Sequence, residues 1–141
     1  MRIAVALPVA VLVALLAGCG APKAPLVISE LEVTKPMPGR SMSAGFFIVT
    51  NNTDETIRIT GVESPQFASV EIHETTVTDG VSRMRELEAL EVPANGSVVL
   101  ERGGKHLMLM RPNNLQGSVS LQFLSGEAPV LSVDYAFPKD N

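Results

Sequence analysis

Short runs of β-forming residues, separated at close intervals by turn signals, fill the chain from residue 26 to residue 137. The runs are rich in Val, Ile, Thr and Phe, which suit pleated, half-buried surfaces. Clusters of Gly, Asn, Asp and Pro lie between them, and no stretch carries a helical period over three turns. The pattern predicts strands at Leu26–Thr34, Ala44–Thr50, Thr56–Val62, Ser69–Val77, Val81–Leu87, Ser97–Glu101, His106–Met110, Val119–Phe123 and Val130–Phe137.

Many short strands with frequent turns are typical of an all-β antiparallel sandwich or barrel. Roughly 110 residues are enough for one modest core between two sheets. No internal repeat or second domain is visible, and the longest gap, Lys35–Ser43 with two prolines, is predicted to be a loop. We therefore expect one β-domain.

The N-terminus has the parts of an export signal. An apolar run, Ile3–Ala17, is broken only by Pro8 and is too short for a membrane span of about 20 residues. The segment Leu16-Ala17-Gly18-Cys19 resembles the bacterial lipobox, which implies that Cys19 is lipidated and becomes the first mature residue. Gly20 follows it instead of Asp, which by resemblance to lipoprotein sorting favours the outer membrane in a host with two membranes.

We expect a signal peptide at 1–18, a lipidated cysteine and tether at 19–25, and a β-domain at 26–141. The protein would be exported, held to a membrane by its lipid, and face the periplasm. Loss of Arg2 with the signal changes the net charge from −4 to about −5. With no basic patch in the sequence, nucleic-acid binding is excluded.

The single cysteine, Cys19, is used for lipid, so the domain has no disulfide and no thiolate for catalysis or metal binding. Nothing resembles a nucleophile elbow or a general acid/base pair at a glycine-rich turn. We expect no enzyme.

One candidate metal-binding pair lies within a predicted strand. Residues two apart in a strand share a face. His106, Met108 and Met110 are therefore expected to point one way, while Leu107 and Leu109 enter the core.

A second pair comes from a predicted hairpin. Asp79-Gly80 is a strong two-residue turn signal. If these residues form the loop, His73 lies opposite Glu86, and Met84 is the diagonal neighbour of His73 on the same face. Diagonal Cβ atoms lie roughly 7 Å apart, so an imidazole and a thioether could reach one metal ion. A register slip of one residue would separate them.

Two imidazoles and two thioethers favour copper(I), because thioether sulfur is soft and neutral. The absent thiol excludes a blue-copper site and argues against structural zinc. We predict one Cu(I) per chain. Met110 shares the face of His106 and could replace Met108 as a ligand.

The spacing of these residues resembles the signature of the periplasmic copper chaperones of the PCuAC family. Ten residues separate His73 from Met84, and 21 residues separate Met84 from His106-x-Met108. The surrounding stretches that also resemble the family are Phe46–Asn51, Val70–Glu74, Arg83–Arg85, Leu90–Ala94 and Gly103–Met110.

This resemblance implies a cupredoxin-like Greek-key β-sandwich or barrel that binds one Cu(I) through His73, Met84, His106 and Met108. It also implies delivery of copper toward the CuA site of cytochrome c oxidase, with subunit II of that enzyme or a Sco-type thiol protein as acceptor. Some members carry a second site in a His/Met-rich tail. Here the sequence stops at Pro138–Asn141, so we expect a single site, in a monomer.

Two other functions fit the same residues. A copper-buffering or resistance lipoprotein would have the same site without a dedicated acceptor. A structural β-sandwich lipoprotein would carry the His/Met set by coincidence. The sequence does not name the acceptor, the affinity for copper, the oligomeric state or the host.

Overall fold

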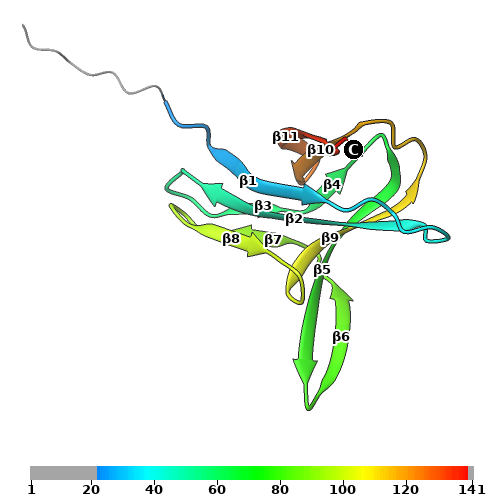
Figure 1. Ribbon diagram of the computed structural model, residues 1–141. Coiled ribbons are helices and arrows are strands. Elements are labelled where there is room, and N and C mark those ends of the chain that lie inside the picture. The colour runs from blue at the N-terminus through cyan, green and yellow to red at the C-terminus, as the bar shows by residue number, and fades with distance from the viewer. Residues whose placement is uncertain (1–21, 140–141) are drawn as a thin grey trace, which may run out of the picture.

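The computed structural model describes residues 22–139, and these form strands and loops without a helix (Figure 1). The strands are β1 (Leu26–Val33), β2 (Met42–Asn51), β3 (Ile57–Ile59), β4 (Gly61–Glu63), β5 (Phe67–Thr78), β6 (Val81–Glu86), β7 (Leu90–Val92), β8 (Ser97–Leu100), β9 (Lys105–Pro112), β10 (Ser118–Ser125) and β11 (Ala128–Ala136).

Most strands belong to a single antiparallel sheet with the order β1-β2-β9-β5-β4-β10-β11. Its first and last strands are in contact, so the sheet is nearly closed into a barrel. Strand β8 pairs with β2, β6 pairs with β5, and β3 and β7 form a separate two-stranded sheet. The predicted all-β antiparallel class is confirmed.

Each of the nine predicted runs contains a strand, but three details of the prediction are wrong. The predicted strand Thr56–Val62 divides into β3 and β4 at Thr60, where the chain leaves β7 and joins β10. There the Thr60 amide donates to the Leu124 carbonyl at 2.8 Å. Strand β7 is too short to stand out as a periodic run, and β2 begins at Met42, inside the expected loop Lys35–Ser43.

The core lies inside the barrel and is built by alternation along the strands. Strand β2 buries every second residue, and the ring of Phe47 meets that of Phe123 edge-on, with centroids 5.5 Å apart. On β9, Leu107 and Leu109 are fully buried. Met108 between them, and His106 and Met110 on either side, therefore lie on the outer face, as the sequence predicted.

Asn51, at the end of β2, is fully buried and fully hydrogen-bonded. Its Nδ2 donates to the carbonyls of Glu55 (2.7 Å) and Val92 (3.1 Å). Its Oδ1 accepts from the amide and the hydroxyl of Thr53 at 2.9 and 2.8 Å. A buried amide with all its partners is specific to one backbone arrangement, so this residue fixes β7 and the following turn against β2.

The hairpin of β5 and β6 extends away from the barrel (Figure 1). Residues 75–84, here called the hairpin arm, make up its outer part. Its turn has φ of 52° at Asp79 and 75° at Gly80, the left-handed pair that a two-residue type I′ loop requires. Every residue of β6 is exposed. The arm therefore contributes nothing to the core, unlike β9 beside it.

The predicted signal peptide, Cys19 and the first two residues of the predicted tether lie outside the described residues, so the division of the N-terminus remains a prediction. Within residues 22–139 there is no helix long and apolar enough to cross a membrane.

Candidate metal centre

The two histidines face each other across neighbouring strands. His73 on β5 and His106 on β9 are direct partners in the antiparallel register, so both side chains leave the same, outer face of the sheet. Their ring centroids are 6.0 Å apart, with an interplanar angle of 51°. The structure therefore brings together the two predicted imidazoles, which the sequence separates by 32 residues.

Hydrogen bonding fixes which nitrogen His106 can offer. Its Nδ1 lies 3.0 Å from the carbonyl oxygen of Gly104. A carbonyl only accepts, so Nδ1 carries the hydrogen and donates, and the neutral ring keeps its lone pair on Nε2. Such a backbone contact is the usual way to set the tautomer and orientation of a metal-binding histidine.

His73 has the opposite arrangement. Its Nε2 lies 2.8 Å from Oε2 of Glu71, and donation to that carboxylate leaves the lone pair on Nδ1. Nδ1 is buried and has no hydrogen-bond partner. A buried nitrogen without a partner is costly in a folded protein. A metal ion bound there would remove that cost, so the donor set fits a metal.

The two predicted thioethers lie on the same face as the histidines. Met108 is two residues beyond His106 and stands opposite Glu71 on β5 and Ala44 on β2. Met84 pairs with Thr75, so it is diagonal to His73, as predicted, and the predicted partnership of His73 with Glu86 is confirmed. The whole predicted set of four donors therefore shares one face of three adjacent strands, β6, β5 and β9.

The four side chains differ in exposure. His106 is 8% exposed and the His73 side chain 13%, whereas Met84, on the hairpin arm, is 51% exposed. Met108 is half-buried. The donors thus range from a fixed, covered imidazole to a thioether in open solvent.

An ion-pair cluster on the opposite face ties the hairpin arm to the barrel. Glu74, between β6 and β9, contacts Nη2 of Arg85 at 2.7 Å and Nζ of Lys105 at 3.1 Å. Hydrogen bonds from Arg85 and then from Lys105 hold the pKa of the Glu74 carboxyl below its ordinary value. Because Glu74 is next to His73, the cluster adds side-chain contacts between the strands at the position where the histidines lie.

Aromatic and cationic side chains stand beside His106. The Phe46 ring lies 6.5 Å from the His106 ring, and the Arg102 guanidinium stacks over Phe46 at 4.6 Å. Arg102 also contacts Oε1 of Glu32 at 2.6 Å. The Phe46 ring and the Arg102 side chain therefore help to cover His106, which explains its low exposure.

An open hollow of about 380 Å³ borders His106 and Met108. Its other walls include Met37, Met42 and Ala44. Sequence reasoning missed Met42 because it assigned that position to a loop. It also missed the contact between Glu71 and His73, although their spacing of two residues on a strand was a usable signal.

Met110, the alternative to Met108, lies four residues from His106. At about 3.3 Å per residue, this is roughly 13 Å along the strand, against roughly 7 Å for Met108. Its direct partners are Ser69 and Met42. This position argues for Met108 over Met110 as the companion of the histidine pair.

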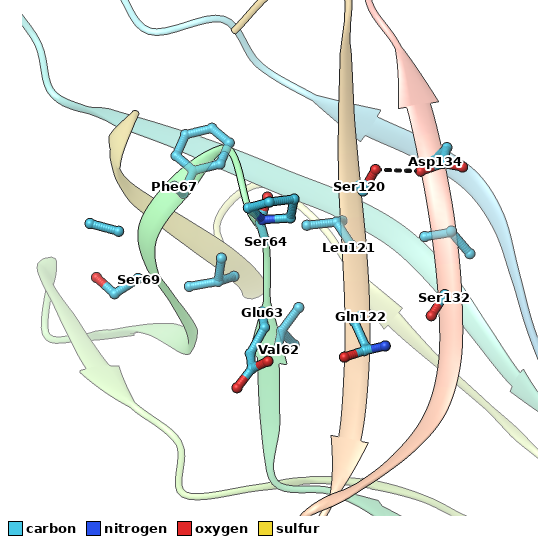
Figure 2. A pocket seen from close by; sticks show the side chains of 14 residues that line it. Val62, Glu63, Ser64, Phe67, Ser69, Ser120, Leu121, Gln122, Ser132 and Asp134 are labelled. Carbon is cyan, nitrogen blue, oxygen red and sulfur yellow. Dashed lines mark hydrogen bonds between the residues drawn. The ribbon is translucent and has the colours of Figure 1, made fainter. Parts of the chain in front are cut away.

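A separate hollow of about 580 Å³ lies over β4, β5, β10 and β11 (Figure 2). Ser120 donates to Asp134 there at 2.6 Å, and Glu63 and Gln122 also line it. None of its lining residues is a histidine or a methionine. Within residues 22–139 no cluster of three His, Cys, Asp or Glu side chains is placed to hold a metal.

Comparison with known proteins gives one matching family model, described as "Putative lipoprotein LpqE-like", over residues 26–127. A curated relative named "Putative lipoprotein Lxx21020", from Leifsonia xyli subsp. xyli, is 31% identical over 101 residues. The matched region covers 67% of this chain and 61% of the relative. The chain therefore spans about three fifths of the length of that curated relative.

Several solved structures share the fold. The copper-bound PCuAC domain from PmoF2 is 21% identical, with a TM-score of 0.65 over 79% of this chain and 91% of that domain. The apo PCuAC domain from PmoF1 is 16% identical, with a TM-score of 0.64 over 82% and 95%.

The solution structure of CuI-DR1885 from Deinococcus radiodurans is 25% identical, with a TM-score of 0.59 over 83% of this chain and 78% of that chain. The resemblance to the PCuAC fold inferred from the sequence is confirmed by these structures.

Proposed function

The chain belongs to the LpqE-like lipoprotein family and has the fold of a PCuAC domain, and on this basis we propose that it is a non-enzymatic copper(I) carrier. Its cargo is one Cu(I), held by His73, His106, Met84 and Met108. The observation that carries the proposal is the buried, partnerless Nδ1 of His73, which lies in a ring 6.0 Å from that of His106. The copper named in the descriptions of the PmoF2 domain and of DR1885 supports it.

The chemistry of the donors selects the metal. Both imidazoles present a lone pair while the other nitrogen is engaged, and both thioethers are neutral and soft. Hard ions such as Mg(II) and Ca(II) prefer oxygen, and structural Zn(II) usually takes thiolates. Because no ligand carries a charge, the single charge of Cu(I) stays uncompensated, which suits transfer to a thiolate.

The gradient of exposure gives an order of release. Met84 is the most exposed of the four donors and lies on the hairpin arm, whereas His106 is covered. An incoming cysteine thiolate therefore replaces Met84 first, while the histidines retain the ion. Copper stays Cu(I) throughout this exchange, so no electron donor or acceptor is needed.

The acceptor that fits is an exported thiol protein. We propose the CuA site of cytochrome c oxidase subunit II, or a Sco-type protein that serves it. The lipobox-like segment ending at Cys19 and the family description support an exported lipoprotein. We propose that its lipid holds it to a membrane facing the periplasm, with the outer membrane favoured if the host has two membranes.

A competition titration tests the site. The protein, extracted in mild detergent, is titrated anaerobically with Cu(I) against a chromophoric chelator, alongside Met84→Leu and His106→Ala. We expect one tight equivalent that both substitutions weaken. Binding that is indifferent to both substitutions would refute the site.

A transfer assay tests the carrier role. Copper-loaded protein is mixed with an apo thiol acceptor domain and separated after seconds. Rapid transfer supports delivery. Retention of copper by the loaded protein despite a tighter-binding acceptor would favour a buffering lipoprotein.

A further inference from the structure

The methionines of this protein are gathered on one face. Besides Met1, the chain has five, and all lie on the outer face that carries the histidine pair or in the hollow beside it. None belongs to the hydrophobic core or packs against it. Methionine is ordinarily a buried residue, so this placement on an exposed sheet face calls for another reason than packing. The five are Met37, Met42, Met84, Met108 and Met110.

Two of these methionines form a pair away from the histidines. Met42 on β2 and Met110 on β9 are direct partners in the register. Side chains directly opposite each other have Cβ atoms roughly 5 Å apart, so two flexible thioethers can turn toward one ion. Met42 is 46% exposed and Met110 is half-buried, which leaves the pair open to solvent.

A third thioether stands beside this pair. Met37, in the loop before β2, is 67% exposed and lines the 380 Å³ hollow together with Met42 and Met108. The hollow thus connects the exposed methionines with Met108 and His106. Three thioethers therefore line the same solvent-open hollow as His106.

The electrostatics of the hollow limit how tightly a cation can bind there. Lys35, Arg40 and Arg102 also line it. The positive charges of these three side chains oppose a cation in the hollow, and Arg102 is also paired with Glu32 and stacked over Phe46. A site in this hollow would therefore bind Cu(I) with lower affinity than the histidine site. Lower affinity is what a site requires if it takes up the ion first and then passes it on.

We propose that Met42 and Met110, completed by Met37, form a second, weaker site for Cu(I), from which the cargo passes by way of Met108 to the histidine pair. This inference rests on the proposed function, since it needs the first site as destination. Each step exchanges one neutral ligand for another, sulfur for sulfur along the methionines and sulfur for imidazole nitrogen at the histidine pair, so no proton or electron moves.

Methyl NMR with a redox-inert ion tests this directly. The protein, extracted in mild detergent and labelled with 13C at the methionine methyl groups, is titrated with Ag(I), which prefers the same soft donors. The first equivalent is expected to shift the methyl signals of Met84 and Met108. Further Ag(I) is expected to shift those of Met42, Met110 and Met37 at higher free concentration.

The possible outcomes separate the two proposals. If Met84 and Met108 shift but Met42 and Met110 stay unchanged through several equivalents, the second site is overturned while the carrier function stands. If Met110 shifts with the first equivalent, it is a ligand of the first site and the second site is also overturned. If neither Met84 nor Met108 responds to the first equivalent, the proposed function itself fails.

A matched variant supplies the functional readout. Met42→Leu/Met110→Leu keeps the size and hydrophobicity of both side chains and removes only the sulfurs. We expect it to retain the first equivalent with unchanged affinity, to lose the second, and to load more slowly from a Cu(I)–chelator complex. Loading at the wild-type rate, with the second equivalent still bound, would overturn the inference.

Discussion

The proposed ligands lie in two different physical settings. Three of them are on the barrel body, here meaning the strands outside the hairpin arm, and Met84 is on the arm. In the body, Leu107 and Leu109 on β9 are fully buried, and His106 between the core and the hollow is 8% exposed. In the arm, Met84 is 51% exposed, and its neighbours on β6 are exposed as well. The same sheet therefore continues from a packed region into one with no core contact.

This contrast explains how the proposed carrier could both retain a copper ion and release it. Ligands on packed strands are held in place by residues that cannot move without breaking the core. A ligand on an exposed hairpin is restrained mainly by the backbone ladder and by the Glu74 cluster, and it can leave the metal without cost to the fold. In the proposed carrier, the body would hold the ion and the arm would carry the ligand that exchanges.

The largest expected effect is on stability and should be confined to the body. Leu109→Ala removes a fully buried side chain, so the free energy of unfolding should fall by about 2–5 kcal/mol. Val77→Ala, on the arm at 67% exposure, should change it by less than about 0.5 kcal/mol. Urea denaturation of both variants measures this. Equal losses would mean that the arm is part of the cooperative core.

The next effect is on copper affinity. His106→Ala removes a covered imidazole, and its cost should exceed the roughly 100-fold that the loss of an outer-shell partner can reach. Met110→Leu, on the same strand and face, serves as a matched control and should leave the first equivalent unchanged. Competition titration of both variants provides the measurement. A His106→Ala protein with wild-type affinity would remove His106 from the site.

A smaller loss of affinity is expected from the arm. Met84→Leu should weaken Cu(I) binding by about tenfold, equivalent to about 1.4 kcal/mol, because this exposed thioether is not held in place by core packing as His106 is. Unfolding should be unaffected, since the side chain is exposed. Val81→Ala, elsewhere on the arm, is the control. If Met84→Leu lost as much affinity as His106→Ala, the distinction between a fixed and an exchangeable ligand would be wrong.

The smallest effect concerns the connection between arm and body. The pKa of Glu74 is lowered by Arg85 and Lys105, so its ion pairs stabilise the folded state above the ordinary carboxyl range, and this stability is lost as pH falls through the lowered pKa. Glu74→Gln should therefore cost about 1 kcal/mol or less near pH 7, a value limited by the exposure of Arg85.

Thermal unfolding of wild type and Glu74→Gln from pH 7 to pH 3 tests the sign. The difference in melting temperature between the two proteins should become smaller as the pH falls below the ordinary carboxyl range. A gap that widens with acidification would contradict the direction assigned to Glu74.

Local rules were enough to predict the parts of this fold that depend on strand period and turn chemistry. The Asp79-Gly80 turn fixed the register of the hairpin, and with it the diagonal relation of Met84 to His73. The alternation Leu107, Met108, Leu109 correctly separated the core face from the outer face.

What could not be predicted depends on pairing between strands distant in the sequence. No local pattern shows that His73 is the direct partner of His106, or that Met110 meets Met42. The division of the predicted strand at Thr60 has the same origin, because it follows from a change of partner strand. The lone pair left on Nδ1 of His73 follows from a hydrogen bond to Glu71; their spacing of two residues indicates a shared face, but the ring nitrogen that is engaged follows from the folded geometry.

The most direct test of the central claim is X-ray absorption at the copper edge of protein loaded with one equivalent of Cu(I). If the proposed site is correct, the nearest neighbours of copper are nitrogen atoms from His73 and His106 and sulfur atoms from Met84 and Met108. The sulfur contribution is then smaller in Met84→Leu. A shell of nitrogen and oxygen alone, or a sulfur contribution that Met84→Leu leaves unchanged, would contradict a site shared between the body and the arm.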